Sequence, residues 1–413
     1  MSLSSPKIRF KDDNGNDFPA WEEKGIGDSI EMLSGFPFPS EEILDGKSTS
    51  ERPRVLLMRG VNITEGSIRH SPDQDRFYCG DVAKLKKYLL EVGDMVIGMD
   101  GSKVGKNSAI VGEAEAGSLL VQRVARIRPI AGVSLRYIYQ HINSFVFHRY
   151  VDRVKTSSGI PHISAKQIRE FKIGFPCLIE QKKIADFLTS VDDRIGQLIK
   201  KKALLEDYKK GVMQQLFSQQ IRFKDDNGND FPNWEEKKLG EITKCFSGGT
   251  PSSGKRDFYG GAIPFIRSAE IAAPKTALFL TKEGYDSSAA KMVEEGDLLV
   301  ALYGANSGEV GIARISGAIN QAILCVRSMQ EVSFLFFWLE YSKDSIVKTY
   351  LQGGQGNLSG KIVQSLKIDL PLIPEQKKIA DFLTSVDRKI ESVSQQITKT
   401  QTFKKGLLQQ MFV

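Results

Sequence analysis

The sequence has few of the residues that hold metals or cross-link a chain, with four cysteines and four histidines among 413 residues. The cysteines form no Cys-x-x-Cys pair and are scattered at Cys79, Cys177, Cys245 and Cys325. His141 and His148 lie seven residues apart on an expected helix. We predict a solvated or capping pair there, because this is not a metal-ligand spacing. The pattern argues against a zinc site and fits a reducing cytoplasm.

Long apolar runs are also missing. The richest run, Phe334–Leu339, is the size of a core segment and falls far short of the roughly 18 residues that a membrane helix needs. Residues Met1–Ser5 lack the basic and apolar regions of a signal peptide. We therefore expect no membrane span and a cytoplasmic protein.

A local excess of positive charge is missing as well. The net charge of +7 is small for this length. Residues 22–157 carry 19 Lys and Arg against 18 Asp and Glu, and residues 235–352 carry 13 against 14. If the protein holds DNA, it does so through local contacts or with the help of partners, and not through bulk charge.

Catalytic signatures are absent too. The sequence has no Asn-Pro-Pro-Tyr or Asp-Pro-Pro-Tyr tetrad for amino methylation and no Gly-x-x-x-x-Gly-Lys-Ser/Thr phosphate loop. The turn at Gly248–Gly249 is too short to cradle a nucleotide. The carboxylate pairs Asp12–Asp13 and Asp225–Asp226 sit in turn sequences, where turn formation is the default reading.

What the sequence does contain is an exact internal duplication. The segment Glu180–Asp192 recurs unchanged as Glu375–Asp387, and each copy runs on without proline to a similar end near Phe217 or Phe412. A period near 195 residues indicates a duplicated domain and not a solenoid. A helix of about 38 residues would span roughly 57 Å.

Apolar residues follow a heptad spacing in both copies, which predicts two helices packed lengthwise on each other. Two unrelated surface helices would leave this seam without a partner. The predicted packing residues are Ile184, Leu188, Val191, Ile195, Leu198 and Leu205 in the first copy, and Ile379, Leu383, Val386, Ile390, Val393 and Ile397 in the second.

A second duplicated segment lies at a different offset. Ile8–Pro19 recurs verbatim as Ile221–Pro232, and its turn and breaker residues predict a structured loop. The second copy directly follows the first long helix, whereas the first copy opens the chain. We therefore expect the opening segment to meet the end of the second helix in space, with an approximate two-fold axis.

Between these repeats lie two variable blocks, residues 22–157 and 235–352, that share a skeleton and differ in their loops. Short alternating strands and Gly-rich turns predict a small curled β-sheet in each. A helix is expected at Leu135–Arg149 and at Phe334–Tyr350, and an exit strand at Phe171–Pro176 and at Leu366–Pro371. The same order of expected elements with different loop sequences indicates two modules that have the same kind of function on different targets.

The predicted fold is α+β: two mixed α/β domains with curled sheets, separated by two long antiparallel helices that form a coiled coil, in a pseudo-two-fold duplication. Four segments follow. They are residues 1–157 (opening segment and first variable domain), 158–220 (exit strand and first long helix), 221–352 (repeated segment and second variable domain) and 353–413 (exit strand and second long helix).

With these motifs in order, the chain resembles the specificity subunits of type I restriction–modification systems over essentially its whole length. The resemblance is carried by Ser247–Ser252, Tyr259–Pro264, Gly296–Leu299, Asn320–Gln321, and Pro374–Ala380 with its twin at residues 179–185. The first block departs from the pattern, because Leu33–Pro39 replaces the Gly-Gly-Thr-Pro turn.

The resemblance implies a non-catalytic subunit that binds double-stranded DNA. Its expected partners are two modification (methyltransferase) subunits and two restriction (translocase/nuclease) subunits. S-adenosylmethionine, ATP and Mg would then belong to those partners, with no cofactor and no metal in this chain.

Base reading in the major groove needs Arg or Lys for guanine and Asn or Gln for adenine. Each candidate could instead contact phosphate or be plain surface charge, and Gln122 and Gln321 could support a loop or read a base. The candidate DNA-binding residues are Arg59, Lys103, Lys106 and Lys155 in the first block, and Arg256, Tyr259, Arg267, Tyr303, Asn306 and Ser307 in the second.

Two unlike modules on a rigid helix pair would read a bipartite, asymmetric site, each module one half. Half-sites one turn apart lie ~34 Å apart, within reach of helices this long. Helix length would set the spacer, so changes between about residues 195 and 205 should alter the spacer alone. The alternative is a structural coiled-coil adaptor without sequence-specific DNA reading; a stand-alone methyltransferase is disfavoured by the missing tetrad.

Overall fold

The computed structural model describes residues 6–47, 54–156, 159–350 and 357–412, which divide into two compact units. Unit 1 comprises Met1–Ile199 together with Gln396–Val413, and unit 2 comprises Lys200–Gln395. Both long helices therefore contribute to both units. The expected boundaries at 157/158 and 352/353 fall outside the described residues, and the four-segment division stays a prediction.

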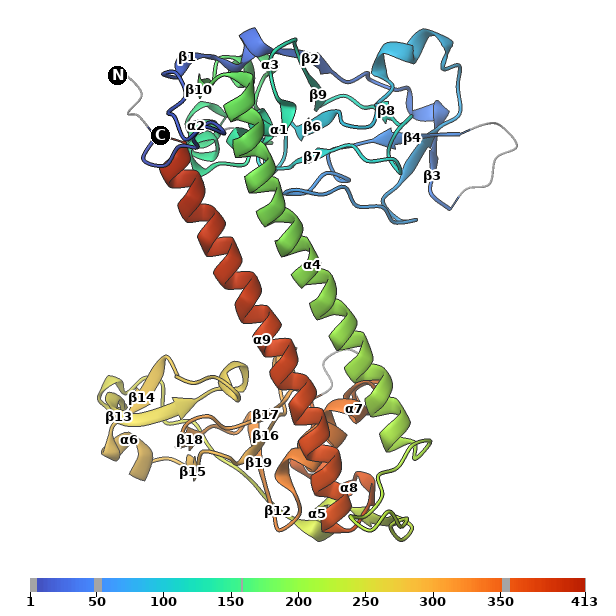
Figure 1. Ribbon diagram of the computed structural model, residues 1–413. Helices are drawn as coiled ribbons and strands as arrows, with labels where there is room; N and C mark the ends of the chain where they lie inside the picture. Colours follow the sequence, from blue (N-terminus) through green and yellow to red (C-terminus); the bar gives the residue numbers. More distant parts are fainter. Residues whose placement is uncertain (1–5, 48–53, 157–158, 351–356, 413) are drawn as a thin grey trace. The chain divides into compact units, whose positions relative to one another are not determined.

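The described residues of unit 1 form three sheets (Figure 1). In sheet order they are β1 (Glu22–Gly25) and β10 (Lys172–Phe175); β2 (Ile30–Ser34), β9 (Val124–Pro129), β6 (Met95–Gly98) and β7 (Ser108–Ile110); and β3 (Ile43–Asp45), β5 (Arg76–Tyr78), β4 (Val55–Met58) and β8 (Leu119–Leu120). Only β4 and β8 pair in parallel among these strands. The helices are α1 (Leu135–Ile142), α2 (Phe145–Val154), α3 (Ala165–Arg169), the first part of the long helix α4 (Leu178–Phe217) and the last part of the long helix α9 (Ile373–Met411).

The described residues of unit 2 likewise form one two-stranded and two four-stranded sheets (Figure 1). Its sheets are β11 (Glu235–Lys238) and β20 (Lys367–Leu370); β12 (Thr243–Ser247), β19 (Ile323–Ser328), β16 (Leu298–Ala301) and β17 (Val310–Ile312); and β14 (Leu278–Leu280), β13 (Tyr259–Ile266), β18 (Gly317–Ile319) and β15 (Lys291–Val293). Its helices are α5 (Leu239–Ile242), α6 (Lys282–Asp286), α7 (Val332–Tyr350), α8 (Gly360–Ser365), the last part of α4 and the first part of α9.

The mixed fold with two long helices is confirmed, and two details differ from expectation. Each block holds two four-stranded sheets and not one small sheet. The helix expected at 135–149 is broken into α1 and α2, because the Asn143 side chain donates to the Tyr139 carbonyl while the Ser144 side chain caps α2 by accepting from the Phe147 amide. These local bonds offer the backbone an alternative to continuing the helix.

The first glutamate of the motif that both long helices share ties the repeated segment to the helix. Glu180 is fully buried and accepts two hydrogen bonds from Arg9 (3.0 and 2.7 Å) and one from Trp21 Nε1 (3.1 Å). Glu375 repeats this in unit 2 with Arg222 (3.0 and 2.7 Å) and Trp234 (3.0 Å). A buried carboxylate is tolerable because three donors and a positive charge replace its lost water.

The next residues of the motif fasten two further elements. The side-chain oxygen of Gln181 accepts from the Ser134 amide just before α1, and its nitrogen donates to the Pro176 carbonyl after β10. The side chain of Lys183 donates to the Lys11 carbonyl and pairs with Asp13. Gln376 and Lys378 make the matching bonds in unit 2. The exact duplication is thus explained by a duplicated set of contacts.

The two long helices pack antiparallel within each unit. In unit 1, Ile184 and Leu188 of α4 share a core with Leu408 and Met411 of α9. In unit 2, the last part of α4 shares a core with Ile379 and Leu383 of α9. Of the predicted packing residues, Ile184, Leu188, Val191, Leu198, Ile379, Leu383, Val386 and Val393 are buried, and Ile195, Leu205, Ile390 and Ile397 are half-buried.

The end of α9 also packs into unit 1 through aromatic contacts. Phe412 stacks on His141 with ring centroids 3.7 Å apart, and its ring meets that of Tyr137 edge-on. The expectation of a solvated or capping role for His141 is wrong, because the side chain is buried under this ring. Burial lowers the pKa of His141 to about 3, so the ring is neutral.

The repeated segments meet the helix ends in matching ways. The amides of Lys7 and Ile8 donate to the Gln410 carbonyl near the end of α9 (2.8 and 3.3 Å). The amide of Ile221 donates to the Gln215 carbonyl near the end of α4 (3.3 Å). The predicted meeting of the opening segment with the end of the second helix is therefore confirmed within unit 1.

Candidate nucleic-acid interface

A hollow of about 710 Å³ opens among the loops of unit 1 at the ends of β4, β6 and β9. Four of its lining side chains are cationic and Asp100 is acidic, so its charge favours an anion. The cationic lining residues are Arg59, Arg69, Lys103 and Arg123. The backbone of these loops is held by strand ends, which gives the side chains fixed starting points.

Arg59 and Lys103 are the two predicted residues that line this hollow. Arg59 donates to the Gln74 carbonyl (3.3 Å), and burial, followed by repulsion from Arg76, lowers its pKa. Lys103 is exposed and pairs with Glu65 at 3.0 Å.

The other two predicted residues of unit 1 are grouped elsewhere. Lys106 and Lys155 both pair with Asp152 of α2, at 3.0 and 2.7 Å. These two hydrogen bonds lower the pKa of Asp152, the bond from Lys155 contributing most. The structure thus divides the four predicted cations of the first block into two pairs.

In unit 2, Tyr259 and Arg267 are engaged by their own loops and Arg256 is exposed. The Tyr259 hydroxyl donates to the Pro251 carbonyl (2.9 Å). Arg267 donates twice to Glu270 (3.1 and 3.0 Å), and this contact holds the pKa of Glu270 at about 2. Arg256 begins a short 3-10 turn, Arg256–Phe258.

The remaining three predicted residues follow β16. Tyr303 is half-buried against the core of unit 2, and Asn306 ends the 3-10 turn Gly304–Asn306. The Ser307 hydroxyl donates to the Leu302 carbonyl (2.9 Å), so Ser307 fixes its own loop. The DNA-binding role of the predicted residues in both units stays a prediction.

The two unlike turns at the start of the blocks share one steric requirement. A Cβ on Gly248 would lie 1.8 Å from the Ile319 carbonyl oxygen, and one on Gly35 would lie 2.1 Å from that of Val121. Only glycine allows so close an approach. Beside Gly248, the Gln321 side chain accepts from the Thr250 hydroxyl at 2.6 Å, which supports the loop.

Sequence reasoning missed Arg69 and Arg123, which line the same hollow as Arg59 and Lys103. A signal for Arg123 was available, because it directly follows Gln122, one of the two glutamines at matching places. Nothing in the sequence around Arg69 points to the hollow, since a long loop brings it there.

No three His, Cys, Asp or Glu side chains gather into a possible metal site in the part of the chain that the structure describes. None of the helices formed by the described residues is both long and apolar enough to cross a membrane.

The two α/β units share the contacts that hold each variable block to its long helix, such as those of Glu180 and Glu375 with an arginine and a tryptophan. Their loops differ. Together these features define a duplicated recognition scaffold. The type I restriction modification DNA specificity domain matches residues 21–206 and again residues 232–400, which together make up most of the chain. The protein belongs to this family, the specificity subunits of type I restriction–modification systems.

Individual relatives agree with this assignment over nearly full length. The MjaX specificity subunit of Methanocaldococcus jannaschii is 28% identical, over 94% of this chain and 92% of its own. The MjaVIII specificity subunit of the same organism is 26% identical, over 97% and 94%. The crystal structure of a type I system S subunit from M. genitalium has the same fold, with a TM-score of 0.61, 16% identity and 99% coverage of both chains.

Proposed function

We propose that this specificity subunit reads a bipartite, asymmetric DNA site, with one recognition domain on each half. The observation that carries the proposal is that the two domains are attached to the long helices by the same contacts but present different loop surfaces. Glu180 and Glu375 hold the two blocks in the same way, whereas their loops present different side chains. Two domains that are held in the same way and carry unlike loops suit two different half-sites.

The charges of the loops support local rather than bulk recognition of DNA. Many cations of the blocks are already paired with carboxylates, as Lys106 is with Asp152 and Arg267 with Glu270. The hollow in unit 1 gathers four cationic side chains around one carboxylate, that of Asp100. Partners that add phosphate contacts would then supply much of the affinity.

We propose further that the long helices set the spacer and dock two modification subunits and two restriction subunits. The chain itself would be non-catalytic, and S-adenosylmethionine, ATP and Mg would be bound by those partners. The duplication also gives each long helix the same exposed residues, Lys182 and Asp186 on α4 and Lys377 and Asp381 on α9, which suits two copies of one partner.

An exchange of the second block tests this proposal. Residues 235–352 are replaced by the corresponding block of another specificity subunit, and the sites methylated in cells are mapped by sequencing. The expected result is a change in one half-site, with the other half-site and the spacer retained. A structural adaptor without sequence reading would give no change of motif, and that outcome would refute the proposal.

A further inference from the structure

Arg123 occupies a backbone conformation that glycine normally fills. Its φ is 69°, at the third position of the turn Val121–Val124, which is closed by a bond from the Val124 amide to the Val121 carbonyl (3.1 Å). Turns with positive φ at this position favour Gly or Asn. Non-glycine residues kept in this region cluster at functional sites, where another requirement outweighs the strain.

The same place in unit 2 shows that the fold does not require an arginine. The Met99 amide donates to the Arg123 carbonyl (2.9 Å), as the Leu302 amide does to the Ala322 carbonyl (2.8 Å). Ala322 therefore stands where Arg123 stands. Ala322 is not among the described non-glycine residues that have a positive φ.

The partner of Arg123 is also particular to unit 1. The guanidinium donates to Asp100 Oδ2 at 3.1 Å, and the Arg123 side chain is 55% exposed. Asp100 directly follows Met99, and Tyr303 directly follows Leu302. The pair Asp100 and Arg123 in unit 1 is thus replaced by Tyr303 and Ala322 in unit 2.

The Arg123 side chain is placed where a ligand could reach it. Arg123 and Gln122 line the hollow that holds Arg59 and Lys103, and they also line a second hollow beside Gly35 and His162. Both hollows are open to solvent at this turn. An aspartate that engages one guanidinium nitrogen fixes the plane of the fork, which favours planar, bidentate recognition.

We propose that Arg123 reads a guanine in the half-site bound by unit 1, and that Asp100 is its positioning residue. The inference rests on the proposed function and names the base that the recognition domain of unit 1 selects. The O6 and N7 atoms of guanine accept both hydrogen bonds of an arginine fork in the major groove. Because unit 2 has Tyr303 and Ala322 at these places, only one half-site should depend on such a contact.

The test uses the full chain, expressed with its own modification subunit, and maps methylated sites in cells. Arg123→Gly removes the guanidinium and suits the positive φ, so the thermal unfolding midpoint should stay equal or rise. The expected result is a loss of roughly 5- to 150-fold in the preference for guanine at one position of one half-site. The other half-site and the spacer should be unchanged.

Two further variants separate base reading from simple charge. Arg153→Ala removes an exposed arginine of α2 that is not among the lining residues of either hollow, and it should leave the motif unchanged. Asp100→Asn should weaken the guanine preference at the same position as Arg123→Gly. A change at a different position, or at none, would remove Asp100 from the positioning role.

Three results would overturn the assignment of Arg123. They are an unchanged motif, an equal loss of methylation at all sites as expected of a phosphate contact, and a wild-type motif without guanine in the half-site of unit 1. A wild-type complex that methylates no bipartite motif at all would instead refute the proposed function itself, before any variant is compared.

Discussion

At the scale of single residues, the strongest requirements come from buried charge. Glu180 and Glu375 have no exposed side-chain surface, and each depends on one arginine and one tryptophan. Removing one partner of a buried pair leaves an uncompensated charge, which costs far more than an intact pair contributes.

Arg222→Ala should therefore destabilise unit 2 by about 3 kcal/mol, the lower part of the range for such losses because Trp234 still donates to Glu375. Chemical denaturation of the purified chain measures the change. Lys224→Ala is the matched control in the same segment, since Lys224 and its partner Asp230 are both exposed. If the two variants lose equal stability, the buried pair does not have this role.

His141 makes the stability of unit 1 depend on pH. Its pKa is lowered to about 3 in the folded chain by burial and is near 6.5 in an unfolded chain. Between these values the unfolded chain binds a proton that the folded chain does not, so stability falls as the pH falls below about 6.5. Above that pH the residue contributes no such dependence.

His141→Phe should remove this contribution and keep the stacking on Phe412. The free energy of unfolding of the variant minus that of wild type should be about 2 kcal/mol larger at pH 5 than at pH 8. Urea denaturation at the two pH values provides the comparison. Equal pH dependence in the two proteins would show that His141 is already protonated or does not stay buried.

Residue roles were only partly predictable from the sequence. The turn role of Asp12 and Asp225 could be read directly, and both carboxylates accept amide hydrogen bonds within their turns. The burial of His141 could not, because the ring that covers it, Phe412, lies some 270 positions further along the sequence. The Arg123–Asp100 pair was missed for a similar reason, since two separate turns form it.

At the scale of elements, the long helices were the most predictable part. The heptad spacing predicted about 38 residues for each, and α4 and α9 have 40 and 39. The broken helix α1–α2 was not predicted, because its apolar pattern runs through the break and only the side-chain bonds of Asn143 and Ser144 end it. The apolar spacing indicates which face of a helix is buried, but it does not indicate where side-chain hydrogen bonds to the backbone end the helix.

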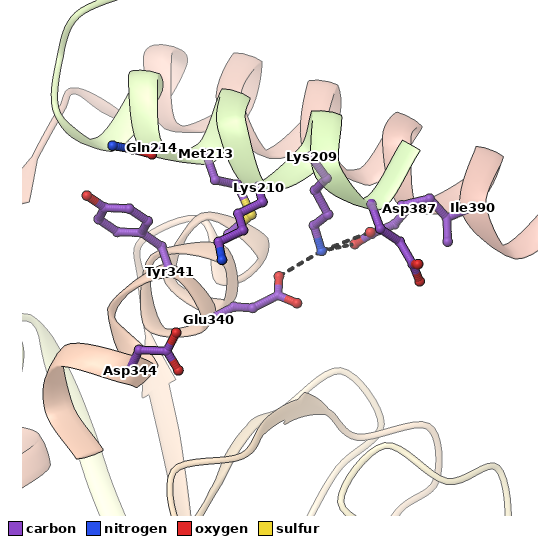
Figure 2. A pocket seen from close by; sticks show the side chains of 10 residues that line it. Lys209, Lys210, Met213, Gln214, Glu340, Tyr341, Asp344, Asp387 and Ile390 are labelled. Atoms are coloured by element: carbon purple, nitrogen blue, oxygen red, sulfur yellow. Dashed lines mark hydrogen bonds and ion pairs between the residues drawn. The ribbon is translucent and has the colours of Figure 1, made fainter. Parts of the chain in front are cut away.

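A cluster of charges lies beside the packed helices in unit 2 and is centred on Lys209. Lys209 of α4 reaches Glu340 of α7 (2.7 Å) and Asp387 of α9 (2.9 Å), as Figure 2 shows. In unit 1, Lys404 of α9 pairs with Asp192 of α4 at 2.6 Å. Each lysine is mostly buried and paired, so these polar positions join the helices instead of interrupting them.

Packing between the helices should be sensitive at buried positions and insensitive at exposed ones. Leu383→Ala, at a fully buried leucine of α9, should cost about 2–5 kcal/mol of stability. Leu204→Ala, at an exposed leucine of α4, should change stability by under about 0.5 kcal/mol. Denaturation curves of both variants give the answer, and similar losses would contradict the predicted seam.

At the scale of the whole molecule, α4 and α9 each belong to both units. Inserting seven residues into α4 between residues 195 and 205, with seven in the facing part of α9, preserves the heptad phase and adds about 10 Å of helix. The methylated spacer should then lengthen by about three base pairs. Mapping of methylated sites tests this, and altered half-sites with an unchanged spacer would refute it.

The division of unit 1 between two distant stretches of chain has a consequence for biosynthesis. Its core needs Leu408, Met411 and Phe412, which leave the ribosome only after the whole of residues 200–395. At about 5 to 20 residues per second, that interval lasts roughly 10 to 40 s. The module that is translated first is thus completed last, and until then the apolar face around Ile184 and Leu188 must be shielded from aggregation by chaperones or by its own partial collapse.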